Sequence, residues 1–283
     1  MKRLIQIEWL KNYSYFPVIL FSSVYFILVI GFTLLCSIKS IPILGIPVNI
    51  RDQGFLNFPQ IWNFLTYITA LLKIFLGLII IFTISNEFTS KMFKQNVIDG
   101  LSKKEFILSK VLTIGLLSLI STLVVFFMGL ILGFSFSKTS DFTLVFKEFY
   151  FILGYFLKLF TFLSFLFFIT VLLKRVVFVF LSLFIWLIVE LILLVVEYSS
   201  KVVEKFDNQG NRITEVPFII SDYLPLNVMS NLIDEPFQRI QLVSQLTGGS
   251  FEYTIPYGAI VASLLYSALF ILGSYWLVKR KDW

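Results

Sequence analysis

The sequence contains no histidine and only one cysteine, Cys36, among its 283 residues. A lone cysteine has no second thiol with which to form a disulfide inside the chain. Zinc sites and many iron sites are built from His and Cys side chains. The composition therefore argues against a metal-centred enzyme. Cys36 lies at the end of an apolar run and is interpreted as a small hydrophobic residue.

Charged residues are also scarce. They make up 14% of the chain, against roughly 25% in soluble domains, whereas 58% of the residues are hydrophobic and the mean hydropathy is +0.91. One soluble core cannot hide such an excess, because a chain of this size leaves much of its surface exposed. The sequence thus predicts a polytopic protein of the lipid bilayer. Its net charge of +6 is attributed to membrane orientation and not to nucleic-acid binding.

Proline is absent from the middle of every long apolar run. Because proline removes a backbone donor and breaks helices, its absence favours a helix through each run. A membrane span needs roughly 20 mostly apolar residues, and the runs that qualify are Phe16–Cys36, Ile61–Ile84, Ile107–Phe134, Phe149–Leu173, Val176–Glu197 and Pro256–Val278. We therefore expect an all-α fold with six transmembrane helices in a single transmembrane domain, residues 1–283.

The distribution of lysine and arginine predicts the orientation of these helices. Short basic stretches precede the first run, separate the second from the third, separate the fourth from the fifth at Lys174 and Arg175, and follow the sixth. The alternate loops are longer and mix basic with acidic residues. Basic short loops face the cytoplasm, so both chain termini are predicted to be cytoplasmic.

Two segments outside the runs are expected to have structure of their own. Residues 1–15 mix polar and apolar side chains and are expected to lie along the inner membrane face. Residues 198–255 form the longest external loop. Within it, "VVEKFDNQGNRITEV" predicts a small hairpin. The stretch that follows predicts two short helices, with Pro225 and Pro236 at their first positions.

The segment 85–106, "SNEFTSKMFKQNVIDGLSKKEF", joins the second and third runs and is predicted to form a helical elbow. We expect the second helix to continue to Ile98 and to end where Gly100 adopts a left-handed conformation. Ser102 and Glu105 have the spacing of a capping box, which satisfies the free amides at the start of a helix. The next helix is therefore predicted to start there.

The elbow carries more apolar side chains than a solvated loop needs, notably Phe88, Phe93 and Val97. Three interpretations compete: the elbow lies in the lipid interface, packs on other loops of the chain, or docks onto a soluble partner through apolar anchors with a charged rim. Phe93 and Val97 are four residues apart, so they share a helix face and are predicted to fill one pocket of such a partner. Glu87 is expected to pair with a basic residue of the partner or of the N-terminal segment.

Three stretches carry a family resemblance: "NEF" (Asn86–Phe88), "NVIDGLSKKEFILSK" ending at Lys110, and "YLPLNVMSNLI" (Tyr223–Ile233) before the last run. With the six-helix layout, they resemble the ABC-2 type permeases, the membrane subunits of bacterial ABC exporters. The resemblance implies an inner-membrane permease, packed beside a second copy, whose elbow is a coupling helix seated in a groove on a separate ATPase subunit. The residues it assigns to ATPase coupling are Glu87, Phe88, Phe93, Val97, Gly100, Ser102 and Glu105.

No G-x-x-x-x-G-K-[ST] phosphate loop occurs in the sequence. The chain therefore lacks the backbone cradle and lysine that hold nucleotide phosphates. Under this resemblance, ATP binds to the partner chain, and this chain is not an enzyme and holds no cofactor. The alternative function is a stand-alone ion or solute carrier. Carriers typically contain broken mid-membrane helices and repeated halves, and neither proline in the middle of a span nor an internal repeat is found here.

Three charged residues stand out well inside the predicted spans, where such residues are rare and are treated as functional candidates. Lys158 and Glu190 lie at similar depth and are predicted either to form a structural ion pair or to face a substrate. Lys73, near the middle of the second span, is predicted to line a cavity or to bond to a neighbouring helix. Trp62 and Trp276, near span ends, are expected at the membrane interface.

Overall fold

The computed structural model describes residues 2–38, 41–43, 46–48, 54–137, 141–201, 203–206, 212–215, 219–236 and 254–280. Its α-helices there are α1 (Lys2–Tyr13), α2 (Phe16–Cys36), α3 (Ile61–Leu71), α4 (Lys73–Thr89), α5 (Met92–Ile98), α6 (Lys103–Phe136), α7 (Phe142–Val145), α8 (Tyr150–Leu173), α9 (Val176–Lys201), α10 (Pro225–Ser230) and α12 (Tyr257–Arg280). The short elements are β1 (Ile41–Ile43), β2 (Ile46–Val48), β3 (Val203–Phe206), β4 (Arg212–Glu215) and the 3-10 helix η1 (Ser221–Tyr223).

Helices long and apolar enough to span a membrane dominate the fold, as predicted. Within the described ranges, five helical stretches qualify on their own: α2, α6, α7 continued into α8, α9 and α12. The remaining predicted span, Ile61–Ile84, is not one straight helix. It consists of α3 and α4, which qualify only as a pair and are bent by 41°.

The bend between α3 and α4 has a local cause. The hydroxyl of Thr66 donates to the carbonyl of Trp62 at 2.6 Å, and that of Thr69 donates to the carbonyl of Leu65 at 2.7 Å. Such bonds bend helices. At the junction, the amide of Leu72 bonds to the carbonyl of Thr69, only three residues back. The expectation of one continuous helix is therefore wrong, because threonines mark a break far less clearly in a sequence than proline does.

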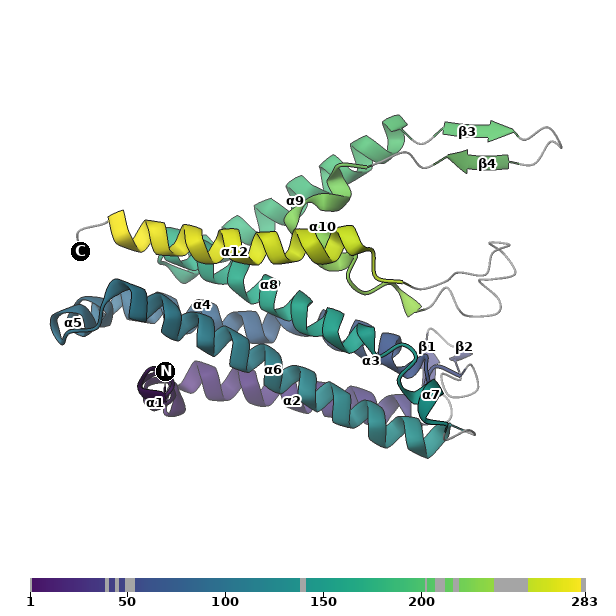
Figure 1. Cartoon of the computed structure of the whole chain (residues 1–283), viewed down its shortest axis with the longest axis horizontal. Coiled ribbons are helices and arrows are strands. Elements are labelled where there is room, and N and C mark those ends of the chain that lie inside the picture. Colours follow the sequence, from purple (N-terminus) through teal and green to yellow (C-terminus); the bar gives the residue numbers. More distant parts are fainter. Residues whose placement is uncertain are drawn as a thin grey trace.

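The central helix is α8. It packs against α3, α4, α6 and α12 and buries most of its side chains. α2 packs on α4, whereas α9 diverges from the bundle (Figure 1). α9 and α2 are the least buried of the five spans, with 11% and 17% of their most apolar windows inside the protein. Their exposed side chains are mostly apolar, so these surfaces suit lipid or another membrane helix.

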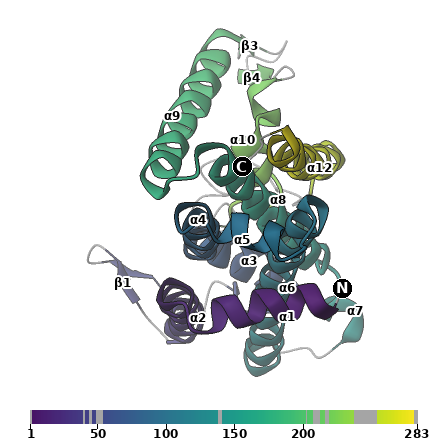
Figure 2. The same cartoon turned by 90° about the vertical axis from the view of Figure 1, so that its left-hand side faces the viewer.

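The two ends of the bundle carry different elements. The start of α1, the end of α12 and the whole of α5 lie together at one end, whereas α7 and the β1–β2 hairpin lie at the other (Figure 1). Viewed from the first end, α1 lies across the bundle below α5 (Figure 2). The elbow and both ends of the described chain thus share one side.

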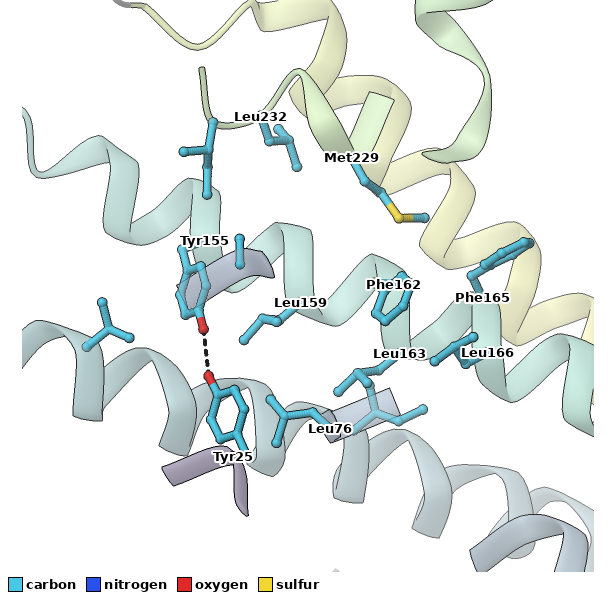
Figure 3. Packing of buried hydrophobic residues seen from close by; sticks show 14 of the residues in the cluster. Tyr25, Leu76, Tyr155, Leu159, Phe162, Leu163, Phe165, Leu166, Met229 and Leu232 are labelled. Carbon is cyan, nitrogen blue, oxygen red and sulfur yellow. Dashed lines mark hydrogen bonds between the residues drawn. The ribbon is translucent and has the colours of Figure 1, made fainter. Parts of the chain in front are cut away.

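The external segment after α9 is partly as predicted. The expected hairpin is confirmed, since β3 pairs antiparallel with β4. The first expected short helix is confirmed as α10, with Pro225 in its first turn. The second, expected to begin at Pro236, falls on residues 237–253, outside the described residues. α10 is not a surface helix, because Met229 and, just after it, Leu232 are fully buried against the core (Figure 3).

A small polar group lies inside the apolar core. The hydroxyls of Tyr25 in α2 and Tyr155 in α8 bond at 2.8 Å (Figure 3), and Ser121 in α6 bonds to both, at 3.0 Å from Tyr155. All three side chains are fully buried. Since hydrocarbon offers no hydrogen-bond partners, such groups link neighbouring membrane helices, and this one ties α2, α6 and α8 together.

Trp62, predicted near the membrane interface, packs inside the protein. It is fully buried, and its ring nitrogen donates to the carbonyl of Val145 in α7 at 2.6 Å. Its ring occupies the space beside Gly129 of α6, where a Cβ would lie 2.6 Å from a ring carbon. The absent side chain at Gly129 thus opens a site for the indole within the bundle.

Candidate functional site

The elbow begins with a break in the helix. α4 ends at Thr89, Lys91 has a left-handed backbone with φ of 59°, and α5 starts at Met92. The hydroxyl of Ser90 bonds to the carbonyl of Asn86 at 2.6 Å, which competes with continuation of the helix. The expectation that one helix runs on to Ile98 is therefore wrong.

The predicted stop and start signals of the elbow are confirmed. Gly100 has φ of 94°, and its amide bonds back to the carbonyl of Val97 at 3.2 Å in a glycine-dependent helix end. The Ser102 hydroxyl accepts from the Glu105 amide at 3.1 Å, and the Glu105 carboxylate accepts from the Ser102 amide at 2.9 Å. This reciprocal capping box starts α6, which continues without interruption to Phe136.

Aromatic side chains hold the elbow together from inside. Phe93 of α5 packs on Phe106 of α6 with ring centres 4.7 Å apart, and on Phe88 of α4 at 5.5 Å. Phe93 is only 2% exposed, whereas Val97 and Ile98 are 37% and 83% exposed. The geometry thus does not meet the expectation that Phe93 and Val97 together fill a partner's pocket. Phe93 stabilises the elbow, and the outward-facing apolar tip is Val97 with Ile98.

A buried ionic cluster connects the elbow to the N-terminal helix. Lys110 of α6 binds the carboxylate of Glu8 in α1 at 2.8 Å and that of Glu87 in α4 at 2.5 Å. Ser109 donates to Glu8 at 3.0 Å, and Lys11 lies 3.7 Å from Glu87. Glu87, for which a partner in the N-terminal segment was one expectation, thus pairs with Lys11 of that segment and with Lys110. The cluster joins three helices at the end of the bundle that carries the elbow.

The charge on Glu8 is stabilised by its neighbours. Burial raises the pKa of this carboxyl, but the ammonium groups of Lys110 and Lys11 and the hydrogen bonds from Lys110 and Ser109 outweigh burial and hold the pKa below its usual value. Glu8 is therefore ionised at neutral pH. The sequence analysis did not select Glu8 or Lys110, although Lys110 lies inside the predicted third span and was detectable there as an intramembrane charge.

Lys158 and Glu190 are not paired with each other. The Glu190 carboxylate accepts from the amides of Leu226 and Asn227, each at 3.0 Å, in the first turn of α10. The Lys158 ammonium donates to the carbonyl of Ser230, at 3.3 Å, in the last turn. Lys158 and Glu190 therefore do not form the predicted ion pair. α10 lies between them, with Glu190 at its N-terminal, positive end and Lys158 at its C-terminal, negative end.

Lys73 lines a cavity, one of its two predicted roles. It is the first residue of α4 after the bend, and its ammonium lies 4.7 Å from the ring centre of Phe162. The cavity has a volume of about 440 Å³ and lies between α4, α8, α9 and α10. Glu190 also lines it, so the structure brings two of the three intramembrane charges to one groove.

Comparison with known proteins does not place the chain in a family: no family model matches it, and no curated protein does. Among the described residues, no group of three or more His, Cys, Asp or Glu side chains is arranged to hold a metal ion. The candidate site therefore consists of the elbow with its ionic cluster at one end of the bundle and the Lys73 groove within the spans.

Proposed function

We propose that this chain is the membrane-spanning permease subunit of an ATP-driven ABC-2 type exporter in a bacterial inner membrane, with ATP bound by a separate subunit. The construction of the elbow is the observation that carries the proposal. The capping box and the buried aromatic centre hold the elbow in a fixed shape, which a part that transmits force requires. The exposed tip, Val97 and Ile98, supplies apolar anchors, and Lys94 and Asp99 beside it supply a charged rim.

The ionic cluster and α6 supply the route by which motion at the tip reaches the spans. α6 starts at the elbow and runs as one helix of 34 residues, packing on α3, α8 and α12. Lys110 fixes its first turns to α1 and α4. A push on the tip therefore tilts α6 as a lever instead of bending the loop. Closure of two ATPase chains on ATP is the event that we propose drives this tilt.

A second copy of the permease is part of this proposal. α2 and α9 are the least buried spans, and both contact α4, which carries Lys73. A partner copy packed against α2, α4 and α9 covers apolar helix surface and encloses the Lys73 groove between the two chains. A substrate then leaves through the interface between copies.

The bend between α3 and α4 supports a second candidate, a stand-alone carrier. Carrier binding sites lie where spans are interrupted near the middle of the membrane, and here Lys73 follows a 41° bend. This candidate leaves the capped elbow and its exposed tip without a role. We therefore rank it below the permease.

Site-specific cross-linking tests the proposal. A photoreactive residue at Ile98, 83% exposed at the elbow tip, is compared with the same residue at Phe142, 76% exposed in α7 at the opposite end. In cells that produce the native complex, Ile98 is expected to cross-link to a soluble chain that mass spectrometry identifies as bearing a phosphate loop, and Phe142 is not. Cross-links from Ile98 to lipid alone would reject a docking role for the elbow.

A further inference from the structure

Lys73 is a positive charge without an acidic partner. Within the part of the chain that the structure describes, no salt bridge involves it, and its observed contact is with the face of the Phe162 ring. Such a contact stabilises an ammonium by less than it costs to hold a lysine charge in the middle of a bilayer. The ring alone therefore leaves the charge incompletely stabilised.

The neighbouring charges are held by polar contacts of their own. Glu190 accepts from two amides of α10 and from the ring nitrogen of Trp186. Lys158 donates to the carbonyl of Ser230. Among the residues that the structure describes, Lys73 is thus the charge lining this groove that has neither a hydrogen bond nor a salt bridge.

Apart from Lys73, Glu190, Asn227 and Ser230, the lining of the groove is apolar, and the groove is open to the membrane side. The apolar part of its wall along α9 consists of Leu183, Leu187, Leu191 and Leu194. Leu187 and Leu191 are 52% and 57% exposed, so a hydrocarbon chain in the bilayer reaches them without crossing protein. Such contact is favourable through close packing.

We propose that this groove binds an amphiphile with one negatively charged head group and a hydrocarbon chain. The head group supplies the counter-ion for Lys73, and the chain lies along the leucines of α9. That the amphiphile is the transported cargo rests on the permease function proposed above. That it binds in the groove does not rest on that function, because binding requires only this chain.

Native mass spectrometry of the full-length chain tests the binding. The probes are phosphatidylglycerol, oleate and, as the uncharged-head comparison, phosphatidylcholine with the acyl chains of the phosphatidylglycerol. The wild-type chain is expected to bind one or both anions about tenfold more tightly than phosphatidylcholine, equivalent to ~1.4 kcal/mol. Lys73→Met is expected to lose this preference and Lys73→Arg to keep it. The anion that shows the preference identifies the head group as phosphodiester or carboxylate.

Two further variants separate the site from general effects. Leu187→Trp fills the groove without changing a charge and is expected to weaken binding of the preferred anion. Lys104→Met removes an exposed lysine in the first turn of α6 and is expected to leave binding of that anion unchanged. Equal binding of anionic and zwitterionic lipid by the wild type, or an unchanged preference in both Lys73→Met and Leu187→Trp, overturns the proposal. Absence of an anion preference in the wild-type chain, together with cross-linking of Ile98 to an ATPase, would refute the groove and leave the permease function standing.

Discussion

Lys110 is the residue on which three helices converge. Its ammonium holds two buried carboxylates, Glu8 and Glu87, that would otherwise lie close together with like charge. The side chain is 3% exposed, so water cannot replace it. A buried charge that loses its partner lowers the stability of the fold far more than an exposed one does. Lys110 therefore contributes strongly to the attachment of α1.

Lys110→Met is therefore expected to lower the free energy of unfolding by about 3–5 kcal/mol and to release α1 from the bundle. Denaturant unfolding in detergent measures the first effect, and protease cleavage within α1 measures the second. Lys94→Met, at an exposed position of α5, is the matched control and is expected to change neither. A Lys110→Met chain as stable as the control would mean that the cluster does not hold α1.

At the scale of elements, α10 depends on charges from outside itself. Its N-cap residue, Leu224, has no side-chain acceptor, so Glu190 of α9 supplies the carboxylate that binds the first free amides. Lys158 of α8 completes the other end at Ser230. Each charge lies where the helix dipole favours it, and α9 and α8 thereby hold α10 inside the bundle.

Glu190→Gln is expected to accelerate amide hydrogen exchange at Leu226 and Asn227 by about tenfold, since a hydrogen bond to a charged group contributes about 1.5–3 kcal/mol. Exchange mass spectrometry of the peptide covering α10 measures this. Asp141→Asn, an exposed acid next to α7, is the control. Unchanged exchange in α10 would show that the apolar packing of Val228 and Met229 is sufficient to hold it.

The contact between α4 and α8 depends on Gly77. A Cβ there would lie 2.3 Å from Cδ1 of Leu166, so Gly77→Ala makes either the Leu166 side chain or the helix pair shift and is expected to cost about 1–3 kcal/mol of stability. Leu166→Ala removes the clashing group, and the double variant is expected to be more stable than the sum of the two single effects predicts. Gly31→Ala, where nothing lies within 4 Å, is the control. Additive losses would exclude this contact as the cause.

For the whole molecule, the basic loops predict a single orientation in the membrane, with the elbow on the cytoplasmic side. The elbow lies with α1 and the end of α12, and α7 lies opposite (Figure 1). Since Cys36 is the sole cysteine, a Cys36→Ser chain allows single reporters. A membrane-impermeant maleimide added to intact spheroplasts is expected to label Phe142→Cys and not Ile98→Cys. Labelling of both before lysis, or the reverse pattern, would contradict a cytoplasmic elbow.

The sequence by itself determined the features that depend on neighbours along the chain. Apolar runs and the positions of proline located the helices, and α2 begins and ends where it was expected. The turn at Gly100 and the capping box of Ser102 and Glu105 depend only on residues a few positions away. The spacing of these residues was therefore sufficient to predict the turn.

Tertiary structure decided everything that depends on contacts between distant residues. Depth along a span suggested that Lys158 and Glu190 meet, but depth does not show that α10, more than thirty residues after Glu190 in the chain, enters the space between them. Phe93 was expected to reach a partner because it lies in the segment between two spans, yet Phe88 and Phe106 cover it. In a membrane bundle the same apolar side chain suits lipid or the core, so only the packing of the helices decides which of the two it faces.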